Sequence, residues 1–314
     1  MEVFYELENY KGEHPLILAL GNFDGLHMGH RKILEYTIIK ATKEKARSGV
    51  LVFDPHPLKI INPSQEIPLL TPLHFRAELI NEMGIDIFLV ASFNEELAKI
   101  FPEDFVKDYL VKKFKVKGVV VGFDYSFGYG GLGKVDHLKK FGQDYGFDVE
   151  VIKPYKIKGR AVSSSLIRRF ITSGEVEEAS LYLGYHFTLE GEVVPGEGLG
   201  KIIGFPTANL AVSENLVIPG NGVYLTITSF RGRELYSLTN IGLKPTFQGK
   251  KRTIETHILD FNDNIYKHEL RIKFLQKIRN EVPFANMEEL KKQISQDIKI
   301  AREIISQEQS SSSV

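Results

Sequence analysis

The sequence predicts two domains of different class, a parallel α/β domain followed by an all-β barrel that ends in a helix. In the first half, short apolar runs alternate with amphipathic stretches, which is typical of a parallel sheet covered by helices. After about Gly184, apolar and polar residues alternate within runs that Gly, Pro and Asn separate, which indicates an antiparallel sheet or small barrel. A length of 314 residues is enough for about two domains.

The expected elements follow from these two patterns. In the first half we expect buried strands at 16–20, 49–53, 86–91, 118–121 and 148–152, and helices at 29–45, 75–83, 103–114 and 135–145. In the second half we expect strands at 187–194, 223–230, 253–261 and 269–275, and a helix at 287–305. We place the domains at 1–184 and 185–306, and expect the polar, Ser-rich tail 307–314 to be disordered.

Composition limits the kinds of partner. Lys and Arg together number 40, as do Asp and Glu, so the net charge is zero and a broad nucleic-acid footprint is not expected. The absence of cysteine excludes disulfides, thiolate metal sites and a cysteine nucleophile. The first residues do not resemble a signal peptide, and no apolar run reaches the length of a membrane span. We therefore expect a cytoplasmic protein without membrane contact, either a monomer or a weak homo-oligomer.

The segment 18–30 carries the strongest local signal of the first half, Leu-Ala-Leu-Gly-Asn-Phe-Asp-Gly-Leu-His-Met-Gly-His. It predicts a strand, a turn and then a helix that begins near Gly29. His27 and His30 are three residues apart and can project from one side of the helix entrance, where backbone N–H groups favour phosphate. Imidazoles at this place can stabilise a phosphoryl group that gathers charge in a transition state. A surface histidine pair beside a helix cap is the alternative.

This segment resembles the His-x-Gly-His signature of the nucleotidyltransferase superfamily, and its longer form resembles the adenylyltransferase half of bacterial FAD synthetases. Segments 53–57, 121–128 and 163–168 match the same branch, so the resemblance covers about residues 15–184. It implies a Rossmann-like nucleotidyltransferase domain in which His27 and His30 contact ATP phosphates. The other site residues implied are Asn22, Phe23, Asp24, Gly29, Ser164, Ser165 and Arg168 for the nucleotide, and Asp124 for the flavin.

Three alternatives stay open for these segments. Ser164 and Ser165 could form only a helix cap, and Arg168 could be a solvated helix residue. His56 could belong to a Pro-bounded turn or contact a ligand. Gly131 stands where the family often carries Arg, and Lys134 is a possible substitute that lacks the bidentate fork of Arg.

The second half contains a Gly-rich segment at 196–209, Gly-Glu-Gly-Leu-Gly-Lys-Ile-Ile-Gly-Phe-Pro-Thr-Ala-Asn. A flexible loop of this kind can bind phosphates through its backbone N–H groups. Thr207 and Asn209 are two apart, so both oxygen-bearing side chains point to one face of an extended chain, as Mg²⁺ ligands would. A glycine-rich hairpin with a Pro turn is the alternative.

A candidate base lies on the expected strand at 253–261. Glu255 and His257 share one face of it, opposite the face that carries Ile254, Thr256 and Ile258. A carboxylate on a rigid strand can accept a proton from a substrate hydroxyl, although most strand carboxylates are simply solvated.

The motif Gly-Phe-Pro-Thr-Ala-Asn at 204–209 is similar to that of riboflavin kinases, and 240–242, 245–247 and 255–257 recur there in the same order. The resemblance covers about residues 185–306 and implies a six-stranded Greek-key barrel. It implies Thr207 and Asn209 at Mg-ATP, Glu255 as general base, and Asn240 at the flavin. It also implies Gly196, Gly200, Lys201 and Gly204 near the phosphates, and a His257 that packs or hydrogen-bonds locally.

Together the resemblances imply a bifunctional enzyme that phosphorylates riboflavin with ATP to FMN and adenylylates FMN with ATP to FAD, releasing pyrophosphate. One alternative is an adenylyltransferase whose kinase half only binds flavin, but Thr207, Asn209 and Glu255 argue against it. Another is a flavin-responsive regulatory protein without turnover.

Overall fold

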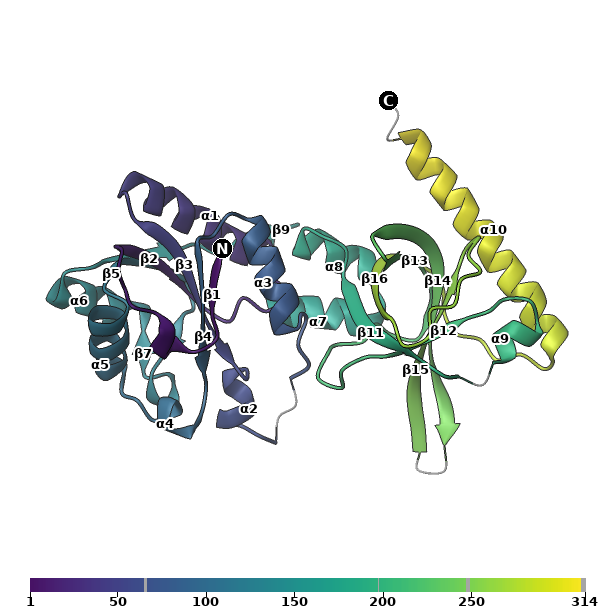
Figure 1. Cartoon of the computed structure of the whole chain (residues 1–314), viewed down its shortest axis with the longest axis horizontal. Helices are drawn as coiled ribbons and strands as arrows, with labels where there is room; N and C mark the ends of the chain where they lie inside the picture. Colours follow the sequence, from purple (N-terminus) through teal and green to yellow (C-terminus); the bar gives the residue numbers. More distant parts are fainter. Residues whose placement is uncertain (65–66, 197, 247–248, 312–314) are drawn as a thin grey trace. The chain divides into compact units, whose positions relative to one another are not determined.

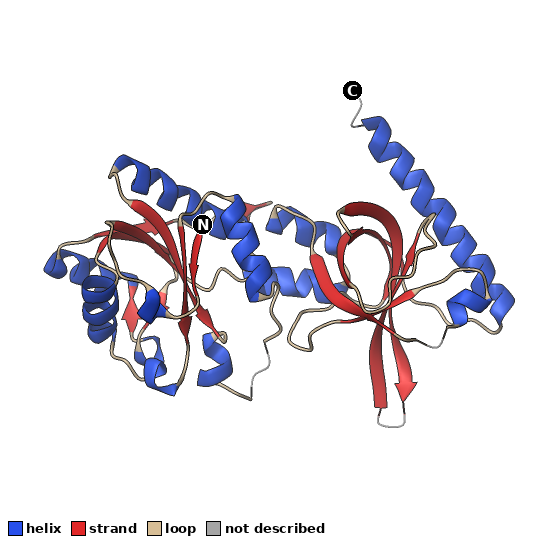
Figure 2. Ribbon diagram, viewed as in Figure 1, coloured by secondary structure: helices blue, strands red, loops and turns tan. Residues whose placement is uncertain are grey.

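A computed structural model describes residues 1–64, 67–196, 198–246 and 249–311 of the chain (Figure 1). The chain divides into two compact units, Met1–Ser164 and Ser165–Val314. The first unit is a layered α/β structure and the second is dominated by strands, as the secondary structure in Figure 2 makes plain.

The first unit contains a six-stranded parallel sheet in the order β1-β4-β3-β2-β5-β8. Its strands are β1 (Glu2–Phe4), β2 (Leu16–Leu20), β3 (Arg47–Asp54), β4 (Ile87–Ser92), β5 (Val116–Gly122) and β8 (Asp148–Ile152). Every residue of β2 is apolar and buried, as suits a strand that helices cover on both faces. The five expected strands are confirmed; β1, a three-residue edge strand, was missed because it is too short to show a pattern.

The helices of this unit are α1 (Met28–Lys43), α2 (Pro57–Ile61), α3 (Leu73–Glu82), α4 (Glu95–Ala98), α5 (Pro102–Asp104) and α6 (Val135–Tyr145), with η1 (Leu7–Asn9) and η3 (Tyr129–Gly131) as 3₁₀ turns. A helix is present where one was expected at 103–114, but most of it is not an α-helix. After the short α5 it continues as a π-helix, η2 (Phe105–Lys113). Apolar spacing does not distinguish these two helix types over nine residues. Two small hairpins complete the unit: β6 (Ser126–Phe127) with β7 (Gly133–Lys134), and β9 (Lys156–Ile157) with β10 (Arg160–Ala161).

The second unit is a closed antiparallel barrel in the order β11-β12-β15-β14-β13-β16, the Greek-key topology that was expected. Its strands are β11 (Thr188–Val194), β12 (Ala208–Ala211), β13 (Gly222–Phe230), β14 (Arg233–Thr246), β15 (Gly249–Ile258) and β16 (Glu269–Arg279). Its helices are α7 (Ser164–Ser173), α8 (Val176–Leu183), α9 (Leu199–Ile202) and α10 (Met287–Ser311). The four expected strands are present, and β12 and β14 were missed. Ile298, Ala301 and Ile304 of α10 pack against Val223, Leu225 and Leu238 of the barrel.

Helices α7 and α8 belong to the second unit, so the compact units meet earlier in the sequence than the boundary expected at 184/185. The Glu177 carboxylate accepts a hydrogen bond from the Lys277 backbone at 3.1 Å, and Gly220 N–H donates to the Ile171 carbonyl at 3.0 Å. These bonds tie both helices to the barrel. Whether the boundary at 184/185 separates the two activities stays a prediction.

The tail beginning at Gln307 was expected to be disordered, but α10 continues through it to Ser311. The Ser306 and Ser310 hydroxyls each donate to the carbonyl four residues earlier, at 2.8 Å, which lets these polar residues stay within a helix. Disorder of the tail stays a prediction, and 312–314 lie outside the described residues.

Candidate active sites

His27 and His30 form a stacked pair at the start of α1. Their ring centroids are 3.5 Å apart and the rings are inclined by 13°. His27 is the N-cap of the helix, and its Nδ1 accepts a hydrogen bond from the backbone N–H of His30 at 3.1 Å. Because Nδ1 is the acceptor, the proton of a neutral ring lies on Nε2, which is then a hydrogen-bond donor.

Gly29 lies close against this stack. A Cβ at this position would lie 3.2 Å from His27 Cε1 and 3.3 Å from His27 Nδ1, which is closer than an ordinary contact. Any side chain there would press on the His27 ring. The lack of a side chain at Gly29 therefore leaves room for the His27 ring, and a contact of Gly29 with the nucleotide stays a prediction.

Asp24 is part of the scaffold that holds this loop. Its carboxylate is 2% exposed and accepts hydrogen bonds from the backbone N–H groups of Leu70 and Thr71 at 3.0–3.1 Å. Arg76 lies 3.6 Å from the same carboxylate and donates to the Asn22 carbonyl at 2.9 Å. The Asp24–Arg76 connection to the loop was missed, because nothing in the sequence links α3 to β2.

A cavity of about 470 Å³ opens beyond the carboxyl ends of β2, β3 and β5. Asn22, Asp124 and His56 line it, together with the aromatic and small residues Gly21, Phe53, Phe93, Phe105, Tyr125, Ser126, Phe127 and Gly131. Burial raises the pKa of Tyr125, so its hydroxyl stays neutral. The apolar walls and few polar groups suit a flat organic ligand. Phe23, the neighbour of Asn22, is buried and packs edge-on against His30 at 5.2 Å, so the cavity adjoins the histidine pair.

The cavity has Gly131 in its lining, at the place where the family often carries Arg. A Cβ on Gly131 would lie 3.5 Å from Ser126 Oγ and 3.8 Å from Lys134 Nζ. The Lys134 ammonium thus approaches the position from which an Arg side chain would extend.

The three residues expected at the ATP triphosphate lie on α7. The Ser164 hydroxyl donates to the Asp24 carbonyl at 3.0 Å, which ties the start of α7 to the histidine loop. Ser165 is exposed, and Arg168 is half-buried, with its carbonyl accepting from Thr172 Oγ1 at 2.9 Å. Both belong to the second compact unit, and their approach to the histidines stays a prediction.

In the second unit, one row of residues crosses five neighbouring strands. Asn209 of β12 is paired with Glu255 of β15, Glu255 with Asn240 of β14, Asn240 with Val223 of β13, and Val223 with Arg279 of β16. Directly opposed residues point to the same face of a sheet. All five line one cavity of about 370 Å³, together with Thr207 and His257.

The Gly-rich segment contains the short helix α9, which the sequence did not predict. Residue 197 lies outside the described residues. A Cβ on Gly196 would overlap the Asn209 amide, and one on Gly200 would overlap the Phe205 carbonyl and lie 3.1 Å from Thr207 Oγ1. Gly204 adopts a φ of +89° in the following turn. These glycines therefore let the segment lie against Thr207 and Asn209.

Of two further residues of this region, His257 lines the cavity and Lys201 does not. His257 Nδ1 lies 2.8 Å from the Pro206 carbonyl, the local hydrogen bond that was expected of it. Lys201 is exposed on α9 and is not part of the cavity lining. Its place near phosphates stays a prediction.

Helix α10 supplies a wall of the barrel cavity, through Leu290, Ile294 and Asp297. The Asp297 carboxylate is 2% exposed and accepts from Arg279 Nε at 2.9 Å and from Gln293 Nε2 at 2.9 Å. These residues were missed, because an Arg and an Asp eighteen positions apart carry no local signal.

Among the described residues, no group of three or more His, Asp or Glu side chains could hold a metal ion. Thr207 and Asn209 offer two neutral oxygens, which suits an ion whose other ligands come from substrate phosphates and water. No helix in the described ranges is long and apolar enough to cross a membrane.

Comparison with known proteins finds two families along the chain. Residues 10–166 match the family described as FAD synthetase, and residues 183–305 match the family described as riboflavin kinase. A relative from Listeria monocytogenes, named bifunctional riboflavin kinase/FMN adenylyltransferase, is 39% identical over 90% of each chain. A relative from Escherichia coli K12 with the same name is 35% identical over 91% of this chain and 92% of its own.

A solved structure from Streptococcus pneumoniae, titled a macrolide-efflux protein, is 26% identical with a TM-score of 0.87. It covers 96% of this chain and 98% of its own. The similarity to all three proteins therefore extends over both compact units.

Proposed function

Because the chain belongs to the family of bifunctional riboflavin kinases/FMN adenylyltransferases, we propose that its two activities use the two sites described above. Riboflavin is phosphorylated at the barrel cavity around Glu255. FMN is adenylylated beside the stacked His27 and His30. The domain limits that we propose for these activities are 1–184 for adenylylation and 185–306 for the kinase.

In the kinase site, Glu255 is the general base. Its carboxylate accepts the proton of the ribityl 5′-hydroxyl while that oxygen attacks the γ-phosphorus of ATP and ADP leaves with the electrons of the broken bond. Thr207 and Asn209 would hold Mg²⁺ together with the ATP phosphates. The ion neutralises phosphate charge when it is bound. The flavin ring lies between the barrel and α10, against Asn240 and Leu290.

In the adenylylation site, a phosphate oxygen of FMN attacks the α-phosphorus of ATP, and pyrophosphate leaves with the electrons of the broken P–O bond. No protein nucleophile is needed, so catalysis depends on positioning and charge stabilisation. His27 and His30 donate hydrogen bonds to the phosphoryl oxygens, and Ser164, Ser165 and Arg168 bind the triphosphate. The isoalloxazine ring occupies the aromatic cavity, near Asp124.

The register that joins Asn209 to Glu255 is the observation that carries the kinase proposal. The experiment is to incubate the chain with riboflavin, ATP and Mg²⁺ and to separate riboflavin, FMN and FAD by chromatography. We expect FMN to accumulate with His27→Ala, and we expect Glu255→Gln to make FAD only when FMN is supplied. Formation of FAD from riboflavin by both variants would contradict the two-site proposal.

We also propose that the enzyme works in the cytoplasm, as a monomer or weak homo-oligomer, and that it binds neither nucleic acid nor membranes. Its equal numbers of basic and acidic residues support the absence of a nucleic-acid partner. Sedimentation velocity at several concentrations tests the oligomeric state.

A further inference from the structure

The hairpin formed by β9 and β10 is the most basic short segment beside the histidine site. Residues 153–161, Lys-Pro-Tyr-Lys-Ile-Lys-Gly-Arg-Ala, contain four cationic side chains and no carboxylate. Lys153, Lys156, Lys158 and Arg160 are all exposed. In a chain whose charges sum to zero, this segment is a local concentration of positive charge.

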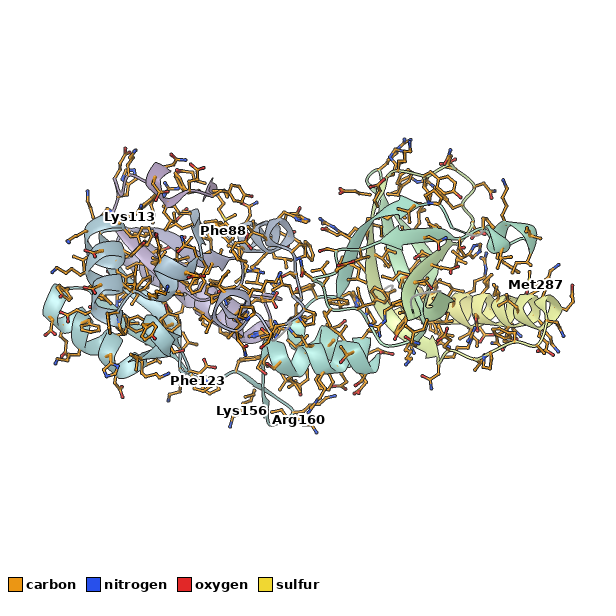
Figure 3. The ribbon with its side chains drawn as sticks, turned by 90° about the horizontal axis from the view of Figure 1, so that it is seen from below. Phe88, Lys113, Phe123, Lys156, Arg160 and Met287 are labelled. Carbon is orange, nitrogen blue, oxygen red and sulfur yellow. The ribbon has the colours of Figure 1, made fainter. Side chains whose placement is uncertain are left out.

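The shape of the hairpin is well defined. Ile157 is paired with Arg160, and Lys156 with Ala161, around a two-residue turn. The turn residues Lys158 and Gly159 have φ values of +50° and +76°, as in the turns that suit the twist of a hairpin. Figure 3 labels Lys156 and Arg160, whose side chains project away from the ribbon of the first unit. The cations are therefore displayed on an ordered arm.

The base of this arm is attached to the histidine loop. Val162 N–H donates to the Tyr155 carbonyl at 2.9 Å and closes the base of the hairpin. The Val162 carbonyl lies 3.9 Å from the place of a Cβ on Gly29, and the Ser164 hydroxyl bonds to the Asp24 carbonyl at 3.0 Å. The base of the hairpin, at Val162, thus lies beside Gly29, between the stacked His27 and His30 in the sequence.

We propose that the β9–β10 hairpin is a polyphosphate-binding arm, which holds the β- and γ-phosphates of ATP and then the pyrophosphate that leaves. Exposed cations at the rim of a site raise the local concentration of an anionic substrate and affect binding more than chemistry. The arm does not touch the reacting α-phosphorus, so its residues position the substrate. The inference rests on the proposed adenylylation beside His27 and His30.

The test uses the full chain with Lys156→Ala and Arg160→Ala combined. We expect the KM for ATP in FMN adenylylation to rise roughly tenfold at low salt, with kcat nearly unchanged. The difference should shrink as NaCl increases, because salt screens exposed charges over about 10 Å at 0.1 M. Inorganic pyrophosphate, titrated calorimetrically without flavin, should bind the variant more weakly by a similar factor.

Two matched variants complete the experiment. Lys139→Ala with Lys140→Ala removes the same charge from exposed positions on α6 and should leave ATP and pyrophosphate affinity unchanged. Lys156→Arg with Arg160→Lys keeps the charge and should restore both affinities. If the arm variant binds pyrophosphate and ATP as the α6 variant does, the arm proposal is wrong. If instead His27→Ala adenylylates FMN normally, the proposed site itself is wrong, whatever the arm does.

Discussion

Asn209 on β12 and Glu255 on β15 are directly opposed on neighbouring strands of the barrel, and Glu255 is in turn opposed to Asn240 on β14. Antiparallel register sends these three side chains to the same face, where they line one cavity. The Asn209 amide is neutral, so it can bind Mg-ATP and leave proton abstraction to the Glu255 carboxylate. In the proposed kinase site Glu255 is the base and Asn209 binds Mg-ATP, and single substitutions can test this separation of roles.

Glu255→Gln should stop riboflavin phosphorylation while FMN adenylylation continues. The substitution keeps the size of the side chain but removes the proton acceptor, so turnover should fall by roughly 10² to 10⁴. Thr207→Ala is the matched variant and should instead weaken Mg-ATP binding, because an oxygen ligand is lost. Steady-state kinetics of the kinase reaction give both parameters. Unchanged turnover with lost ATP binding in Glu255→Gln would assign the carboxylate to the metal.

His27→Ala or His30→Ala should abolish FMN adenylylation and leave riboflavin phosphorylation nearly intact. Removal of one such transition-state donor typically lowers the rate by on the order of 10² to 10³. Chromatography of FMN and FAD measures the first activity and conversion of riboflavin the second. Full adenylylation by the double variant would exclude the histidine site.

Gly29→Ala should impair adenylylation although both histidines remain. The added methyl group would lie 3.2 Å from His27 Cε1, so the ring would have to shift by a few tenths of an ångström. Because catalysis at this site depends on positioning, we expect a lower rate of adenylylation. A control substitution should not strain the backbone. Gly84→Ala would do so, because Gly84 has a φ of +88°, and Ser180→Ala on α8 is therefore the control. Normal adenylylation by Gly29→Ala would mean that the stacked geometry is not needed.

Asp297→Ala should destabilise the second unit by about 3 kcal/mol, because it leaves the half-buried Arg279 guanidinium without its carboxylate. Arg302→Ala is the matched control, since it breaks an ion pair between exposed groups, Arg302 and Asp260, and should change stability by less than about 1 kcal/mol. Urea unfolding followed by circular dichroism compares the two. Equal effects would show that Arg279–Asp297 does not fasten α10.

A fragment ending at Gly184 should adenylylate FMN, and one starting at Tyr185 should phosphorylate riboflavin. The second fragment lacks α7 and α8, which bond to the barrel through Ile171 and Glu177. A longer fragment starting at Ser165 therefore serves as the comparison. Activity in the longer fragment alone would place these helices with the kinase, and folded but inactive fragments of all three kinds would mean that each activity needs both units.

The sequence by itself determined the class of both units, five of the six strands of the parallel sheet and most of the proposed site residues. Runs such as 16–20 and 148–152 have the strand pattern within their own few residues, and the motifs around His27 and Thr207 are contiguous. Local periodicity and contiguous motifs need no knowledge of distant residues. For the same reason the three-residue β1 and the extension of α10 to Ser311 were not found.

Only the tertiary structure decided which distant residues share a cavity. The row from Asn209 to Arg279 depends on the register of five strands, and the Arg279–Asp297 pair depends on where α10 packs. Likewise, Asp24 reaches Thr71 and Arg76 only after α3 has packed against the loop that follows β2. Strand register and helix docking are set by burial summed over many residues far apart in the chain, so no local pattern carries them.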